Sequence, residues 1–110
     1  MEVQTRKEKV AVVVSVKGRM DAVTAPEFEK NMLDFISKGE KTFVVNLLEL
    51  DYISSAGLRS ILALAKKLKE GEGKIVFTGL KGPVEEVFKI TGFPSLFKIF
   101  DSEEHALREI

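Results

Sequence analysis

One segment of this sequence passes directly from a strand pattern to a helix pattern, and it restricts the possible folds more than any other. Residues 42 to 47 contain the apolar run Phe43 to Val45 and show hardly any alternation, as in a strand that is buried on both faces. A helix is expected after Ser55, because apolar residues recur there at helical spacing, at Leu58, Ile61, Leu62, Ala65 and Leu68. A buried strand followed by an amphipathic helix is typical of an α/β domain.

The rest of the chain continues this alternation. Thr24 to Glu27 resembles a capping box with proline in the first turn, which predicts the start of a helix. Further helices are expected to begin at Pro83 and at Ser102. Strands are expected at residues 3–6, 10–16, 42–47, 74–78 and 97–100. The prediction is a single α/β domain over residues 1–110, with a mixed, mostly parallel sheet of four to five strands and about four flanking helices.

Three loops are expected to follow parallel strands, and such loops gather at one edge of a sheet. They are residues 18–21, 49–55 and 79–82. The third of these strands is followed by the helix at Pro83, and the second by the helix after Ser55. The sequence therefore predicts a surface that these loops share.

Two serines, Ser54 and Ser55, lie in the turn between strand and helix. Free backbone N–H groups at a helix start donate hydrogen bonds to the oxygen of a capping hydroxyl and favour negative charge. One interpretation is that either serine is an ordinary N-cap. The other is that a hydroxyl in this position carries a function.

Catalytic and metal-binding interpretations have little support. A serine-hydrolase turn needs glycine two residues before the nucleophile, where Ile53 stands, and His105 is the only histidine. Asp21 and Asp51 alone offer too few oxygen ligands to bind a hard cation. They are more simply interpreted as turn residues or helix caps. The chain has no cysteine, which excludes thiol catalysis and disulfides. We expect no enzyme, no cofactor and no metal site.

Charge and hydropathy restrict the partners. Seventeen basic and seventeen acidic residues cancel, which argues against nucleic acid as a partner. No apolar run approaches the roughly 20 residues of a membrane span, and the first nine residues are too polar for a signal peptide. A cytoplasmic protein without membrane contact is expected. Lys66, Lys67 and Lys69 are read as a solvated helix face, and Phe93, Phe97 and Phe100 as core.

Two motifs carry a resemblance to a known family. Residues 46–62 read NLLELDYISSAGLRSIL, and residues 16–25 read VKGRMDAVTA. Together they resemble the signature of the STAS domain, the fold of bacterial anti-sigma factor antagonists. In that family an acidic residue usually precedes the phosphorylated serine, whereas this chain has Ser54 there and Ala56 in place of a Ser or Thr. Alignment on Gly57 implies that Ser55 is the phosphorylated residue.

The resemblance implies a partner-switching protein that regulates transcription. Such an antagonist binds an anti-sigma factor, which is also a serine kinase, and is released when that kinase phosphorylates Ser55. A serine phosphatase then resets the cycle. The residues expected to contact the partner are Gly18, Arg19, Met20, Asp21, Tyr52, Ile53, Ser54, Ser55 and Arg59. The alternatives are a STAS scaffold or transporter-associated subunit that is not phosphorylated, and a module that binds a small ligand or nucleotide.

Overall fold

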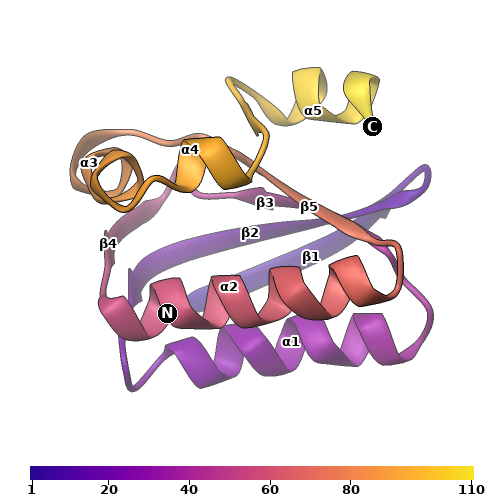
Figure 1. Ribbon diagram of the computed structural model, residues 1–110, viewed down its shortest axis with the longest axis horizontal. Helices are drawn as coiled ribbons and strands as arrows, with labels where there is room; N and C mark the ends of the chain where they lie inside the picture. Colours follow the sequence, from indigo (N-terminus) through magenta and orange to yellow (C-terminus); the bar gives the residue numbers. More distant parts are fainter.

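The computed structural model describes all 110 residues and contains a six-stranded mixed sheet with five helices (Figure 1). The strands are β1 (Glu2–Glu8), β2 (Ala11–Met20), β3 (Thr42–Asn46), β4 (Leu50–Ile53), β5 (Lys74–Thr78) and β6 (Ile99–Phe100). The helices are α1 (Ala25–Ser37), α2 (Ser55–Glu70), α3 (Gly82–Thr91), α4 (Phe93–Leu96) and α5 (Glu103–Glu109). The predicted α/β class and the mixed, mostly parallel sheet are confirmed.

The sheet has the order β1-β2-β3-β5-β6, and β1 alone runs antiparallel to its neighbour. The strands joined through helices are parallel, as predicted. β4 pairs with β2 beyond the end of β3, so β2 has β3 beside its first half and β4 beside its last residues. β4 differs from the prediction, which places these residues in a turn, because four residues with two exposed side chains give little strand signal.

The core lies mainly on one face of the sheet. Figure 1 shows α1 and α2 side by side along that face, with α5 beyond the other. Side chains from β2, β3 and β5 pack there against α1, α2 and α3. Four phenylalanines, Phe77, Phe88, Phe93 and Phe97, meet edge to face at centroid distances of 5.1–5.4 Å. Each edge-to-face pair stabilises the fold by about 0.5–1.5 kcal/mol in addition to the effect of burying its apolar surface.

A smaller cluster lies beneath α5. It joins Ala11, Val13, Val44 and Val76 of the sheet to Ala106, and Phe100 packs here rather than with the other aromatic residues. The carboxylate of Glu103 binds both Arg6, at 2.6 Å, and Asn46, at 2.6 Å. These contacts hold the last helix against the sheet.

Helix α2 differs from the prediction in one position of its apolar face. Leu62 was expected to point inward, but 42% of it is exposed, and Leu64 is buried instead. Gly57, Ile61, Leu64 and Leu68 fit one face of a 3.6-residue helix, and Leu62 falls outside it. The correction leaves an apolar side chain on the outer face of α2.

Candidate functional site

Strands β2 and β4 bring the two sequence motifs together. Arg19 is opposite Tyr52 and Met20 is opposite Ile53 in a parallel register. The N–H of Ser54 donates a hydrogen bond to the carbonyl of Met20 at 2.9 Å. The expectation that the first motif lies beside the serine turn is therefore confirmed.

The two serines of the turn have different environments. Ser54 is the N-cap of α2, with extended backbone, and its Oγ accepts a hydrogen bond from the N–H of Gly57 at 3.4 Å. Ser55 is the first residue of α2, and its exposed hydroxyl makes no hydrogen bond within the chain. The capping role thus belongs to Ser54, which leaves the hydroxyl of Ser55 available to a partner.

The start of α2 lies unusually close to the sheet. A Cβ on Gly57 would stand 2.8 Å from Cγ1 of Ile53 and 3.0 Å from Cγ of Met20, which is too close for any side chain. Met20 and Ile53 are 0% and 3% exposed. The prediction that these two contact a partner directly is wrong, because the start of α2 covers them. They position the serine turn from beneath.

A tight turn at Asp21 joins β2 to α1. Oδ1 of Asp21 accepts hydrogen bonds from the N–H groups of Val23, at 3.0 Å, and Thr24, at 3.1 Å. The Thr24 N–H is the main cause of a lowered pKa of the Asp21 carboxyl, and the charge of Arg19 adds to it. The Thr24 hydroxyl donates to the carbonyl of Arg19 at 2.7 Å. Because Thr24 makes no side-chain hydrogen bond that caps α1, the predicted capping box is wrong.

Arg19 and Tyr52 form an exposed stacked pair beside this turn. The guanidinium carbon of Arg19 lies 4.1 Å from the centre of the Tyr52 ring. Gly18 precedes the pair and has a φ of +101°, a backbone conformation that residues with a side chain rarely adopt. The register between β2 and β4 shifts directly after it. Arg59 lies one helical turn after Ser55 and is exposed. Apart from the two buried residues, the structure therefore places the predicted partner-binding residues on one accessible edge.

Sequence reasoning missed two residues of this edge. Val23 is 86% exposed in the turn that Asp21 holds, although valine is usually buried. Thr24 fixes the same turn through its hydroxyl. An Asp followed three residues later by Thr is typical of such a side-chain turn, and that spacing could have indicated it.

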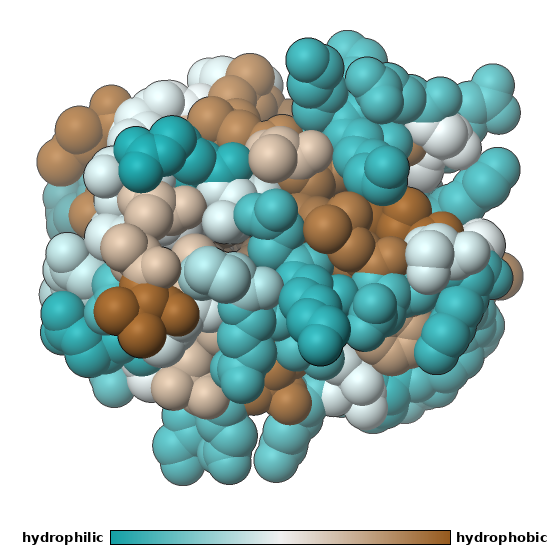
Figure 2. All heavy atoms as spheres, turned by 90° about the horizontal axis from the view of Figure 1, so that it is seen from below, coloured by the Kyte–Doolittle hydropathy of each residue, from teal (hydrophilic) through white to brown (hydrophobic).

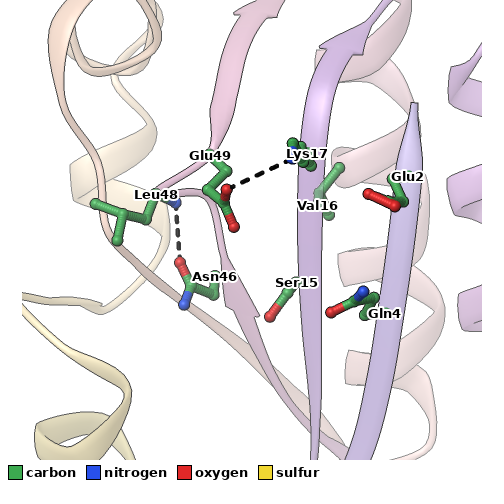
Figure 3. A pocket seen from close by; sticks show the side chains of 8 residues that line it. All are labelled: Glu2, Gln4, Ser15, Val16, Lys17, Asn46, Leu48 and Glu49. Atoms are coloured by element: carbon green, nitrogen blue, oxygen red, sulfur yellow. Dashed lines mark hydrogen bonds and ion pairs between the residues drawn. The ribbon is translucent and has the colours of Figure 1, made fainter.

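Small hollows adjoin the edge on the side of β1. Lys81, from the third predicted loop, lines one of them together with Gly18, Glu49 and Asp51. The three predicted segments therefore lie near one another, although residues 18–20 belong to β2 and residues 50–53 to β4 rather than to loops. A second hollow, of about 130 Å³, is shown in Figure 3 and is crossed by the Lys17–Glu49 ion pair at 4.0 Å. It is lined by Glu2, Gln4, Ser15, Val16, Lys17, Asn46, Leu48 and Glu49. Sites for small ligands are lined mostly by apolar side chains, whereas both hollows are lined mainly by polar and charged ones, so they give the small-ligand alternative little support.

The only histidine, His105, lies away from this edge. His105 packs against Phe100, and its Nδ1 lies 3.0 Å from Oδ1 of Asp101, on the α5 side of the sheet. No group of three His, Asp or Glu side chains is arranged to hold a metal ion. None of the helices combines the length and apolar character needed to cross a bilayer.

Comparison with known proteins identifies the family. Residues 2–106 match the STAS domain. The chain belongs to the STAS-domain family. BtrV of Bordetella bronchiseptica, a candidate anti-sigma factor antagonist, is 40% identical over 95 residues, which cover 86% of this chain and 82% of BtrV. The anti-sigma-B factor antagonist of Staphylococcus aureus is 25% identical over 104 residues, covering 94% and 96% of the two chains.

Solved structures of STAS proteins have the same fold. The crystal structure of a candidate anti-sigma factor antagonist of Thermotoga maritima, TM1081, matches with a TM-score of 0.93 at 22% identity, covering 98% of this chain and 93% of that one. The phosphorylated form of SpoIIAA, the Bacillus cell fate determinant, matches with a TM-score of 0.79 at 20% identity, with 98% of both chains covered. The S. aureus relative and SpoIIAA are both named as anti-sigma factor antagonists.

Proposed function

We propose that this STAS protein is an anti-sigma factor antagonist controlled by phosphorylation of Ser55. It binds a serine-kinase anti-sigma factor while Ser55 is unmodified, which frees a sigma factor to direct transcription. Phosphorylation releases it, and a serine phosphatase restores the binding form. The cycle would take place in the cytoplasm.

One observation carries the assignment of Ser55. Of two adjacent serines, Ser54 is held as the N-cap by Gly57, whereas Ser55 is exposed and has no hydrogen-bond partner. Among the relatives, the S. aureus protein is named an anti-sigma-B factor antagonist, and SpoIIAA has been solved in phosphorylated and unphosphorylated forms. The relatives support the class of function, and the serine turn supports the site.

The chemistry is a phosphoryl transfer. Oγ of Ser55 forms a bond to the γ-phosphorus of ATP, the bond to the β,γ-bridging oxygen breaks, and ADP leaves. The kinase must supply the base that takes the hydroxyl proton and the magnesium ion that binds the phosphates. This chain contributes the exposed hydroxyl on a fixed turn and the neighbouring charges of Arg19 and Asp21.

The physics of the switch follows from the position of Ser55. A phosphate adds nearly two negative charges, which the N-terminus of α2 accommodates without refolding. In a docked complex the same charge must lose its hydration. A penalty of about 3 kcal/mol weakens binding by roughly a hundredfold, which is enough for release.

The test uses purified serine-kinase anti-sigma factors encoded in the source genome, with ATP. We expect one phosphate on wild type, located on Ser55 by peptide mass spectrometry, and none on Ser55→Ala. Ser54→Ala is the matched control and should still be phosphorylated, although it loses its cap at a cost of about 1 kcal/mol. A phosphate found on Ser54 would overturn the assignment of Ser55. No phosphate with any such kinase would favour an unphosphorylated STAS scaffold.

A further inference from the structure

The outer face of α2 carries a line of positive charge that begins at Ser55. A helix places residues i, i+4, i+7 and i+11 on one stripe. In α2 these are Ser55, Arg59, Leu62 and Lys66, and Lys69 continues the stripe. All five are exposed. At about 1.5 Å per residue the stripe is roughly 21 Å long.

The cations of this stripe have no acidic partner. Arg59, Lys66 and Lys69 take part in none of the ion pairs of the chain, all of which lie on other elements. From Ser55 to Lys69 the helix contains no Asp or Glu. The neighbouring α1 exposes both signs, with Glu27, Lys30 and Asp34. The stripe is therefore locally cationic on a chain whose net charge is zero.

Leu62 lies in the middle of these cations. It is 42% exposed, whereas Ile61 and Leu64 are buried in the core. Figure 2 views the molecule from the side of α1 and α2, where brown apolar side chains are separated by teal hydrophilic ones. Protein interfaces generally have an apolar centre and a polar rim, and Leu62 with polar groups on either side of it along the stripe matches that arrangement.

We propose that this stripe docks an acidic surface of the anti-sigma factor that contains an apolar pocket for Leu62. The inference rests on the proposed function and extends the binding surface about 20 Å along α2 from Ser55. Charge complementarity specifies the occupant, because unpaired cations attract and orient an acidic partner.

An acidic partner also explains why added negative charge releases the protein. Arg59 lies four residues after Ser55 on the same face of the helix, so a phosphate on Ser55 pairs with Arg59, the first cation of the stripe. It then neutralises part of the stripe and repels the acidic partner at the same time. The stripe thus sets the direction of the switch.

An anionic membrane is the other surface that cations attract, and the structure disfavours it. A helix that lies on a bilayer buries a broad apolar face in the lipid. The apolar face of α2, with Ile61, Leu64 and Leu68, is already buried against the sheet. Leu62 alone gives too little apolar area for stable membrane binding.

The test measures binding of unphosphorylated variants to the kinase that phosphorylates wild type, by calorimetry. The double variant Arg59→Glu/Lys66→Glu should bind at least about tenfold more weakly than wild type. Its matched control, Lys89→Glu/Lys98→Glu, changes the net charge equally on exposed residues outside α2 and should stay within about twofold. Leu62→Gln should weaken binding about fivefold with an unchanged melting temperature. Raising the salt concentration should weaken wild type more than the double variant.

The possible outcomes separate this inference from the proposed function. If the kinase binds and phosphorylates wild type but the stripe variants bind equally well, the stripe is not the docking surface and the proposed function stands. If wild type neither binds nor is phosphorylated, both proposals fail. If phosphatidylglycerol vesicles bind wild type but not the double variant, a membrane is the occupant and the protein partner is rejected.

Discussion

Substitution of Gly57 by alanine tests how firmly the serine turn is fixed to the sheet. The added Cβ would meet Cγ1 of Ile53 at 2.8 Å and Cγ of Met20 at 3.0 Å, and neither atom is the free end of its side chain. Overpacking of this kind costs about 1–3 kcal/mol. Alanine recovers up to about 1 kcal/mol through its higher helix propensity. The net effect is a loss of about 1–2 kcal/mol in the free energy of unfolding.

Thermal and urea unfolding followed by circular dichroism measure this loss. For a chain of this size we expect the melting temperature to fall by about 4–8 °C. Gly71→Ala is the control at the other end of α2, where φ is −96° and the nearest neighbour of a new Cβ is 3.8 Å away. It should change stability little. If Gly57→Ala is as stable as wild type, the contact between α2 and the sheet is looser than we describe, and the reasoning is refuted.

Three further changes test other contacts. Glu103→Gln should destabilise the protein by up to about 1 kcal/mol near pH 7. The hydrogen bond from Arg6 lowers the pKa of Glu103. The contribution of the Glu103 carboxylate to the free energy of unfolding is therefore complete above the ordinary pKa of about 4.3 and disappears as the pH falls through the lowered pKa. Equal denaturation curves of wild type and Glu103→Gln at pH 7 would contradict this. Asp21→Asn keeps an acceptor for the turn but loses the carboxylate charge that the lowered pKa of Asp21 shows to be favoured in the folded protein. It should therefore lower the melting temperature less than Asp21→Ala does; if both melt alike, the turn does not depend on the acceptor at this side chain. Arg19→Ala removes the stack on Tyr52 and should weaken kinase binding about tenfold with little effect on stability; unchanged affinity would remove Arg19 from the binding surface.

The sequence predicts those elements whose side chains repeat with a clear period. Strand β3 was predicted from a short run of aromatic and β-branched residues, Phe43 to Val45, and helix α2 from a 3.6-residue apolar repeat. Strand β4 was missed because only Leu50 and Ile53 of its four residues are buried. Its strand character comes from pairing with β2, which a local pattern does not encode.

The site was predicted in outline but not in its division of roles. Motif spacing put Ser55, Arg19 and Asp21 on one edge. It could not show that Ser54 makes the capping hydrogen bond, because two adjacent serines have equal intrinsic preference for that role. Nor could it show that Met20 is buried, since its burial depends on a close contact with Gly57, which is distant in sequence.

The hydrogen bond from Ser54 to Met20 has a consequence for how fast the protein can signal. It joins the residue before Ser55 directly to the central strand β2, and Gly57 holds the next residues against the same strand. No flexible segment separates the modified side chain from the rigid sheet. If Ser55 is phosphorylated as we propose, the phosphate changes the charge of this surface without a rearrangement of the backbone. The response of the proposed switch would then need no refolding step, and its output should follow the balance of kinase and phosphatase activity.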